Sequence, residues 1–368
     1  MNTLRRAVTA FLLLKLSVLI LNLWQFPVLR RSPNVSPPIA APPARPQPPQ
    51  ASLLVPMRNE AARLAASIPA MLAQGADEII MLDDESADGT GALARALVAE
   101  HPGARVVDGV PAPPGWVGKN WACHQLAAKA SSPLLIFCDA DVLLAEGAID
   151  AVITEMQIQR ADVFSVFPRQ ITASLGEHLI TPLIDDVLLC FLPFWLLSAD
   201  VPQAATANGS LLAFTRPAYN HCGGFAAVRS ELVEDVAMAR RARKAGLKLG
   251  LALGGPLVAT RMYRGYREVL GGMSRGLLPV TGGSRSRLVL ATGWHLLAYT
   301  LPWGLARRRR GWGLLLVLGV AERALVEIKT GRRTVWQAAL MPLSPLAAVP
   351  IVARALRRNQ RWKGRVYS

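Results

Sequence analysis

Residues 51–141 alternate between short apolar runs and amphipathic stretches, which predicts strands and helices in turn. The apolar runs end in turn residues, as expected for strands that are buried on both faces of a sheet. They lie at residues 52–56, 78–82, 104–108 and 134–138. The amphipathic stretches carry apolar residues three and four positions apart, and they lie at residues 59–72, 90–100 and 120–129. This order predicts an α/β domain with a mostly parallel sheet, which binds its ligand beyond the carboxyl ends of the strands.

Longer apolar stretches lie on both sides of this domain. The first, at residues 7–26, contains Lys15 and predicts an N-terminal anchor helix, with a cleaved signal peptide as the alternative. Three stretches near the C-terminus predict membrane helices, and the prolines in them indicate kinks or re-entrant turns. They lie at residues 288–306, 314–326 and 335–353. If all three crossed, the arginines at 307–310 would lie outside the cell, so we expect at least one not to span.

Two further segments complete the division of the chain. Residues 27–50 are rich in proline and predict an extended tether. Residues 187–197 are too short to span a bilayer and too apolar for an exposed loop, which indicates an interfacial segment or part of the core. The expected regions are a membrane anchor at 1–29, a linker at 30–50, the catalytic α/β domain at 51–285, and membrane-associated helices with a basic tail at 286–368.

Charge and cysteine content indicate where the chain works. The formal charge is +16, and the arginines cluster beside the apolar stretches, which favours anionic lipid headgroups over nucleic acid. The four cysteines are widely spaced and form no metal-binding pattern, which indicates buried thiols in a reducing compartment. They are Cys123, Cys138, Cys190 and Cys222. We therefore predict an integral protein of the cell membrane whose α/β domain faces the cytoplasm.

Asp139 and Asp141 are the clearest candidates for chemistry. They stand two residues apart directly after the predicted strand at 134–138, so a turning backbone can aim both carboxylates into the crevice at the strand end. Such oxygen ligands suit Mg²⁺ or Mn²⁺, whose coordination is completed by water and substrate phosphates. The pattern predicts a divalent-metal site for a nucleotide diphosphate. As an alternative, Asp141 simply caps the next element.

Polar residues at two other points predict contacts with a nucleotide. Asp83 and Asp84 end a predicted strand, where a carboxylate can accept hydrogen bonds from a base or a ribose. Lys119 can donate to a base or to phosphates, although a solvated lysine fits the sequence nearly as well. Trp116 either covers a ring or closes a loop.

Glu234 and Asp235 begin an amphipathic stretch at residues 236–245. The amino end of a helix favours ionised carboxylates, and a general base must be ionised to accept a proton. We therefore predict Asp235 as the general base, with Glu234 as the second catalytic candidate. Simple helix capping is the alternative.

Six short motifs, which occur in family order over residues 52–250, resemble those of the inverting glycosyltransferases of family 2, which have a GT-A fold. They are Val55-Pro56-Met57-Arg58-Asn59-Glu60, Asp83-Asp84-Glu85-Ser86-Ala87-Asp88-Gly89-Thr90, Gly118-Lys119-Asn120, Asp139-Ala140-Asp141, Gly223-Gly224-Phe225 and Glu234-Asp235. The resemblance implies a Rossmann-like, mostly parallel sheet, a metal at Asp139 and Asp141, and Asp235 as the base. The residues expected at the nucleotide sugar are Pro56, Arg58, Glu60, Asp83, Asp84, Lys119 and Asp139. Glu85 departs from the family pattern, which usually has glycine or asparagine there.

The resemblance also implies a reaction and its partners. We expect one sugar to move from a nucleotide-diphosphate sugar, with UDP the expected nucleotide, to a lipid acceptor in the membrane. A carotenoid, a hopanoid or another isoprenoid is expected, because the anchor, the run at 113–121 and the hydrophobic C-terminal third resemble that branch of the family. One alternative is transfer to a polyprenyl phosphate. Another is an inactive membrane scaffold or lipid-binding protein on the same fold.

Overall fold

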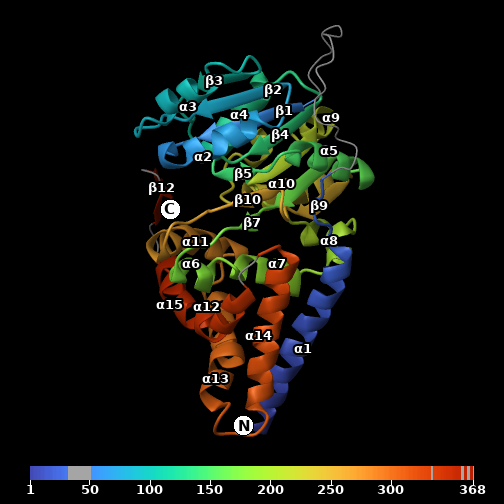
Figure 1. Cartoon of the computed structure of the whole chain (residues 1–368), viewed down its shortest axis with the longest axis vertical. Coiled ribbons are helices and arrows are strands. Elements are labelled where there is room, and N and C mark those ends of the chain that lie inside the picture. The colour runs from blue at the N-terminus through green and yellow to red at the C-terminus, as the bar shows by residue number, and fades with distance from the viewer. Residues whose placement is uncertain (32–50, 333–334, 358–359, 363–364, 368) are drawn as a thin grey trace. The chain divides into compact units, whose positions relative to one another are not determined.

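The structure, a computed structural model, describes residues 1–31, 51–332, 335–357, 360–362 and 365–367 (Figure 1). The chain forms two compact units, each built from segments that are distant in sequence. One unit comprises residues 27–169 and 196–260, and the other comprises residues 1–26, 170–195 and 261–368. The tether predicted at residues 27–50 lies outside the described residues from position 32 onward.

The first unit is an α/β unit built on a seven-stranded sheet in the order β3-β2-β1-β4-β8-β6-β9 (Figure 1). Every neighbouring pair is parallel except those of β8, which runs antiparallel to both β4 and β6. The strands are β1 (Ala51–Met57), β2 (Glu78–Asp83), β3 (Ala104–Asp108), β4 (Leu134–Cys138), β6 (Val163–Phe167), β8 (Leu211–Thr215) and β9 (Leu249–Leu253). A small sheet in the order β5-β10-β7 consists of β5 (Val142–Leu144), β10 (Val258–Thr260) and β7 (Arg169–Gln170). The predicted mostly parallel α/β sheet is confirmed.

Helices connect these strands at the predicted places. They are α2 (Ala61–Leu72), α3 (Thr90–Val98), α4 (Gly118–Lys129), α5 (Ala148–Ile158), α9 (Arg216–His221) and α10 (Glu234–Lys244), with the 3₁₀ turns η1 (Pro202–Ala204) and η2 (Phe225–Val228). The predicted helices at 59–72, 90–100, 120–129 and 236–245 correspond to α2, α3, α4 and α10. Their observed ends differ by about two residues, as expected where helix ends fray.

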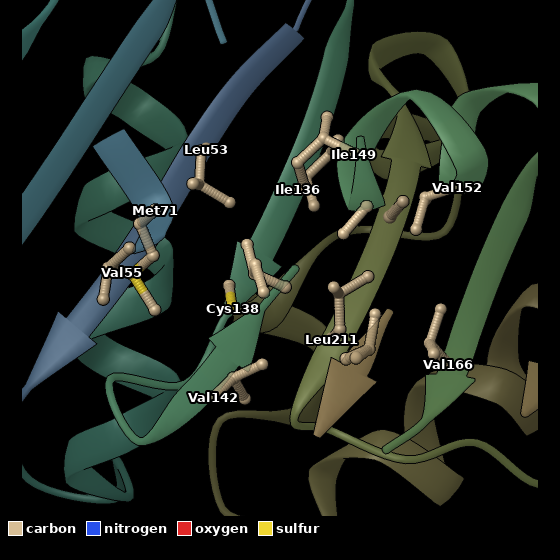
Figure 2. Packing of buried hydrophobic residues seen from close by; sticks show 14 of the residues in the cluster. Leu53, Val55, Met71, Ile136, Cys138, Val142, Ile149, Val152, Val166 and Leu211 are labelled. Atoms are coloured by element: carbon tan, nitrogen blue, oxygen red, sulfur yellow. The ribbon is translucent and has the colours of Figure 1, made fainter. Parts of the chain in front are cut away.

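The core of this unit explains the uninterrupted apolar runs. Alternate side chains of β1 and β4 point to one face of the sheet, where they pack against α2 and α5 (Figure 2). Leu53, Ile136 and Met71 are fully buried there. The residues that point the other way, such as Leu54 and Phe137, are also buried, and α4 packs against β1 and β2. Burial on both faces selects apolar residues at every strand position.

The second unit is helical apart from a short hairpin. Its elements are α1 (Asn2–Gln25), α6 (Leu175–Ile180), α7 (Leu183–Phe191), α11 (Tyr266–Val280), α12 (Arg285–His295), the π-helical η3 (Leu296–Thr300), α13 (Leu301–Leu305), α14 (Trp312–Lys329), the 3₁₀-helical η4 (Val335–Leu343), α15 (Ser344–Ala355), β11 (Gln360–Trp362) and β12 (Arg365–Tyr367). Helix α8 (Phe194–Ser198) lies at the boundary between the two units in sequence. This division differs from the expected one, because residues 170–195 and 261–285 group with the terminal helices and not with the sheet.

Two of the described helical stretches, α1 and residues 335–355, are long and apolar enough to cross a membrane. The predicted anchor and the last of the three predicted C-terminal stretches are therefore still candidates for membrane-spanning helices. The stretch at 314–326 falls in α14, whose buried face carries Glu322, Arg323 and Glu327. The stretch at 288–306 is divided among α12, η3 and α13. Neither of these two meets the same criterion of length and hydropathy.

Residues 187–197 are partly buried and partly exposed, and their contact with a membrane interface stays a prediction. Leu189 and Leu197 are buried, whereas Phe191 and Trp195 are exposed, so the segment contributes to the interior and also leaves aromatic rings on the surface. A turn after α7 separates the two parts of this segment.

Lys15 is buried inside the helical unit (1% exposed) although it stands in the middle of an apolar helix. Its Nζ donates to Oδ2 of Asp186 at 2.9 Å, to Oε1 of Glu322 at 2.8 Å and to the hydroxyl of Tyr299 at 2.6 Å. The Tyr299 hydroxyl donates in turn to Oε1 of Glu322. These partners lie on α7, η3 and α14, so polar contacts bind α1 to three other elements of its unit. Helix α1 is thus a structural member of this unit in addition to its predicted role as an anchor.

Candidate active site

The end of strand β4 holds Asp139 and Asp141 in a tight turn. The backbone N–H of Asp139 donates to the carbonyl of Ser210 at 2.9 Å, and its own carbonyl accepts from the N–H of Val142 at 3.1 Å. The first bond ties the turn to the beginning of β8, and the second closes the chain back into β5. Because the turn spans only these few residues, both aspartates lie at the carboxyl end of β4, where parallel sheets bind ligands.

Lys119 joins this turn to the start of helix α10. Its Nζ lies 2.8 Å from Oδ1 of Asp139 and 3.0 Å from Oε1 of Glu234. The side chains of Lys119 and Asp139 are each about one quarter exposed, at 25% and 28%, and that of Glu234 is 13% exposed. One ammonium group therefore bridges the predicted metal ligand and the predicted catalytic helix.

Asp235 is held by two backbone donors. Its Oδ2 accepts from the N–H of Gly209 at 2.8 Å, and its Oδ1 accepts from the N–H of Val236 at 2.8 Å. The second donor belongs to the first turn of α10, where N–H groups have no partner within the helix and favour negative charge. The N-cap position of α10 is Val233, so Asp235 is not the capping residue, although it satisfies one backbone donor of the first turn. The two bonds fix its carboxylate beside the Lys119 cluster.

Gly209 is a site residue that the sequence prediction missed. A Cβ atom at this position would lie 3.0 Å from Oε1 of Glu234 and 3.3 Å from Nζ of Lys119. The Gly209 carbonyl also accepts from Nζ of Lys119 at 3.4 Å. The available signal was the dipeptide Asn208-Gly209, a typical turn sequence just ahead of a strand.

Burial and repulsion raise the pKa of two aspartates at this site, Asp235 and Asp141. Burial, and then the neighbouring charge of Glu234, raise the pKa of Asp235 to about 7. Burial, and then the charges of Asp139 and Glu60, raise the pKa of Asp141 to about 6. Burial would lower the pKa of Lys119, but the carboxylates of Asp139 and Glu234 raise it well above its usual value. Lys119 is consequently a fixed positive charge among acids that resist ionisation.

Lys119, Asp139, Gly209 and Glu234 line a small pocket, whereas Asp141 and Asp235 are not part of its lining. Its wall combines the charged groups with apolar side chains from β4, α4 and the segment after β8, including two of the four cysteines. The lining residues are Pro56, Lys119, Cys123, Phe137, Cys138, Asp139, Gly209, Leu212, Phe225 and Glu234. Pro56 thus lies where the nucleotide-sugar contact was predicted. The apolar part of the wall was not predicted, because the sequence pattern of these strands and this helix is the one expected for residues of the hydrophobic core.

Arg58 and Asp84 form a second polar group at the ends of β1 and β2. Arg58 Nη1 donates to the carbonyl of Asp84 at 2.6 Å and lies 3.4 Å from its Oδ2. It also lies 3.7 Å from Oε2 of Glu85. The N–H of Asp84 donates to the carbonyl of Met57, so strands β1 and β2 are joined beyond their last ladder residues. The predicted nucleotide-contact residues Arg58 and Asp84 therefore lie together.

Asp83 and Glu60 take part mainly in local structure. Oδ1 of Asp83 accepts from the N–H of Ser86, which closes the turn after β2. Glu60 pairs with Arg63 at 2.8 Å, and its N–H donates to Oγ1 of Thr90. Both residues stand at the predicted edge of the sheet, and their contact with a nucleotide stays a prediction.

Trp116 packs against other aromatic rings. Its ring lies 4.9 Å from that of Trp121 and 5.1 Å from that of His124, by their centroids. Trp116 does not belong to the pocket lining described above. The alternative prediction, that this residue closes a loop, fits the contacts better than the prediction that it covers a ligand ring.

The donor set at the end of β4 fits a hard divalent cation. Asp139 and Asp141 offer carboxylate oxygens, and the raised pKa of Asp141 shows that its negative charge is poorly compensated by the protein alone. A cation with few protein ligands completes its coordination with phosphates and water, so two carboxylates are sufficient. Asp139 and Asp141 are the residues that would hold it.

Comparison with known proteins finds a family model and a curated relative that match part of this chain. Residues 52–182 match the family model described as glycosyl transferase family 2. A curated relative, the 4,4'-diaponeurosporenoate glycosyltransferase of Staphylococcus haemolyticus, is 28% identical over 232 residues. That match covers 61% of this chain and 60% of the relative, so the chain spans less than two thirds of the relative's length.

A solved structure shows the same fold. The mannosyltransferase PcManGT from Pyrobaculum calidifontis, solved with GDP-Man and Mn²⁺, matches with a TM-score of 0.53 at 17% identity, covering 94% of this chain and 97% of that one. Glucosyl-3-phosphoglycerate synthase from Mycobacterium tuberculosis is also similar, with a TM-score of 0.41 at 21% identity, covering 64% and 78% of the two chains. The predicted GT-A-like fold is confirmed.

Proposed function

We propose that the protein is an inverting glycosyltransferase, because residues 52–182 match the family model described as glycosyl transferase family 2. It moves one sugar from a nucleotide-diphosphate sugar to an isoprenoid lipid in the cell membrane, with its α/β unit on the cytoplasmic side. The observation that carries the proposal is the cluster at the end of β4. There Lys119 bridges Asp139 and Glu234, and Asp235 lies next along α10.

Each part of the cluster has a role in this reaction. Asp139 and Asp141 would hold a divalent cation, which would supply positive charge to the leaving diphosphate. Pro56, Arg58 and Asp84 bind the nucleoside at the ends of β1 and β2. Asp235, oriented by the N–H groups of Gly209 and Val236, accepts the proton of the acceptor hydroxyl as that oxygen attacks the anomeric carbon.

The lipid acceptor is supported by the helical unit and by one relative. Helix α1 and residues 335–355 can each cross a bilayer by length and composition, and α1 exposes Leu13, Leu14 and Trp24. The curated relative bears the name of an enzyme acting on 4,4'-diaponeurosporenoate. The four free, buried cysteines are consistent with a reducing compartment.

The partial ionisation of Asp235 near neutral pH leaves a second candidate acceptor to be tested. With a pKa of about 7, the ionised form of Asp235 is a stronger base than an ordinary aspartate, but only part of the protein carries it at neutral pH. An acceptor that is already anionic, such as a polyprenyl phosphate, has no proton to lose. Replacing Asp235 by Asn separates the two. A hydroxyl acceptor predicts a large loss of turnover with donor binding intact, and an anionic acceptor predicts nearly normal turnover.

The decisive experiment compares lipid extracts of cells that express the wild-type protein or Asp139→Asn. We expect an isoprenoid lipid with a hexose-sized mass increment in wild-type extracts and its absence with the variant. Calorimetry with Mn²⁺ and UDP-sugar provides the control for binding. Absence of any metal-dependent nucleotide-sugar binding would instead support the inactive scaffold.

A further inference from the structure

The ammonium group of Lys119 lies against the predicted metal ligand itself. Its three contacts are with Oδ1 of Asp139 at 2.8 Å, Oε1 of Glu234 at 3.0 Å and the carbonyl of Gly209 at 3.4 Å. An ammonium group has three N–H donors and no acceptor. The ammonium group therefore makes two ion pairs and one hydrogen bond with oxygen atoms of the site, and Asp139 already has a cationic partner.

Two other cationic side chains near the site, both arginines, form ion pairs with other carboxylates. Arg58 pairs with Asp84 and Glu85, and Arg63 pairs with Glu60. Helix α4 aims Lys119 into the pocket, because Cys123, one turn further along the same helix, lines the pocket beside it. The bridge to Glu234 holds the ammonium between β4 and the first turn of α10.

We propose that Lys119 is a built-in counter-cation that competes with the divalent metal for Asp139 until the nucleotide diphosphate arrives. The inference rests on the proposed function, and it assigns Lys119 a positioning role in place of the predicted nucleoside contact. Before donor binds, the ammonium offsets the charges of Asp139 and Glu234. When the metal enters with the diphosphate, the additional phosphate oxygens compensate for the loss of the Lys119–Asp139 contact.

This arrangement makes metal binding dependent on the donor. A metal alone meets Asp139 together with a nearby positive charge, and like charges a few ångströms apart repel strongly at a partly buried site. A metal that carries a diphosphate brings its own negative charge and meets less repulsion. The protein is thereby expected to discriminate against free divalent cations.

The test measures Mn²⁺ binding by calorimetry on the full chain in detergent micelles, without any nucleotide. Lys119→Met is expected to bind Mn²⁺ about tenfold or more tightly than the wild type, because one positive charge next to the site is removed. Lys129→Met is the matched control, since it removes the same charge from the exposed end of the same helix and should leave Mn²⁺ affinity unchanged. Lys119→Arg keeps the charge and should keep the weak Mn²⁺ binding.

A second variant guards against misfolding of Lys119→Met. Glu234→Gln removes one of the two carboxylates that share the ammonium, so Lys119 should bind Asp139 more strongly and Mn²⁺ affinity should fall. Unchanged or weaker Mn²⁺ binding by a folded Lys119→Met, combined with weaker UDP binding, would overturn the proposal and favour a nucleoside contact. Binding of Mn²⁺ together with UDP by the wild type would support the proposed function whatever Lys119→Met does. If the wild type binds neither Mn²⁺ nor UDP, the proposed function itself fails.

Discussion

At the scale of single residues, Glu85 occupies a backbone conformation that disfavours its side chain. Its φ angle is +54°, in the left-handed region, which costs a residue with a Cβ atom about 1–2 kcal/mol. Family 2 usually has glycine or asparagine at this position of the motif, and both tolerate a positive φ. The conformation thus accounts for the family preference from which this chain departs.

Replacing Glu85 by Gly is expected to stabilise the protein by about 0.5–1 kcal/mol, because glycine adopts the left-handed conformation without strain. Thermal unfolding in detergent micelles measures the effect. Glu85→Ala is the control that removes the same carboxylate and keeps the Cβ atom, and it should not stabilise. Equal stabilisation by both variants would attribute the effect to the charge.

Asp235 predicts the pH dependence of transfer. A general base works only when it is ionised, so the rate should rise with pH through the Asp235 pKa of about 7 and level off above it. Asp235→Asn should lower the rate to a hydroxyl acceptor by about 10²–10⁴-fold and abolish this rise. A pH profile of single-turnover transfer measures both. An unchanged profile in the variant would assign the proton transfer to another group.

The raised pKa of Asp235 also makes stability fall as the pH rises, whereas the transfer rate is expected to rise. Because the folded state binds the Asp235 proton more tightly than the unfolded chain does, the carboxyl contributes stability at low pH. This contribution is lost as the pH rises from about 4 through about 7. Conditions that activate the base therefore cost stability.

Asp141 should show a trade between stability and metal binding. Burial and the charges of Asp139 and Glu60 raise its pKa to about 6, so its ionised form is unfavourable at neutral pH without a metal. Asp141→Asn is expected to stabilise the metal-free protein by about 1–2 kcal/mol and to eliminate the rise in melting temperature on adding Mn²⁺ with UDP. Glu100→Gln, at an exposed position, is the control and should change neither. Loss of stability in Asp141→Asn would contradict the repulsion that we describe.

The sequence motifs predicted where the polar residues of the site lie, but they did not predict which residues these side chains contact. The positions of Asp139, Asp141 and Asp235 followed from strand and helix ends, because a parallel sheet gathers its carboxyl ends at one edge. The partners of Lys119 did not follow, because a flexible four-carbon side chain reaches residues 20 and 115 positions away in sequence. Gly209 was missed for a similar reason, since its importance comes from three groups that meet only in the folded chain.

At the scale of secondary structure, the elements that could be predicted from the sequence are the buried strands of the sheet. Strands β1, β2, β3 and β4 were predicted because each is a short apolar run between turn residues. Residues 170–195 could not be assigned from sequence, because the short helices α6 and α7 depend on packing against α11, α14 and α1. A periodic pattern reveals a buried face and does not reveal what covers it.

Helix α1 is expected to depend on Lys15. Lys15→Met leaves Asp186 and Glu322 buried without their cation, so unfolding should become easier by about 3 kcal/mol or more. Glu322→Gln leaves Lys15 with one carboxylate and should cost much less, because the remaining Lys15–Asp186 pair is neutral. Unfolding midpoints of the two variants in detergent micelles test this order. Equal costs would show that Lys15 does not stabilise the unit through its charge.

At the scale of the whole molecule, neither unit is a continuous piece of chain. The α/β unit is interrupted by residues 170–195, and the helical unit is assembled from three segments. A fragment of residues 51–260 would therefore retain α7 with Asp185 and Asp186 but would lose α1, α14 and Arg332, which supply their cations and packing. Such a fragment is expected to aggregate, because buried charges without partners and exposed apolar faces destabilise it.

The buried position of Lys15 also has a consequence for synthesis. Lys15 is synthesised 171 residues before Asp186 and 307 residues before Glu322. Its two carboxylate partners are therefore absent when α1 first forms. If α1 crosses the bilayer as proposed, an unpaired lysine in its middle would cost about 2.5–3.5 kcal/mol on insertion scales. Asp186 on α7 is the first partner to be synthesised and can already neutralise Lys15, and Glu322 on α14 then completes the buried cluster.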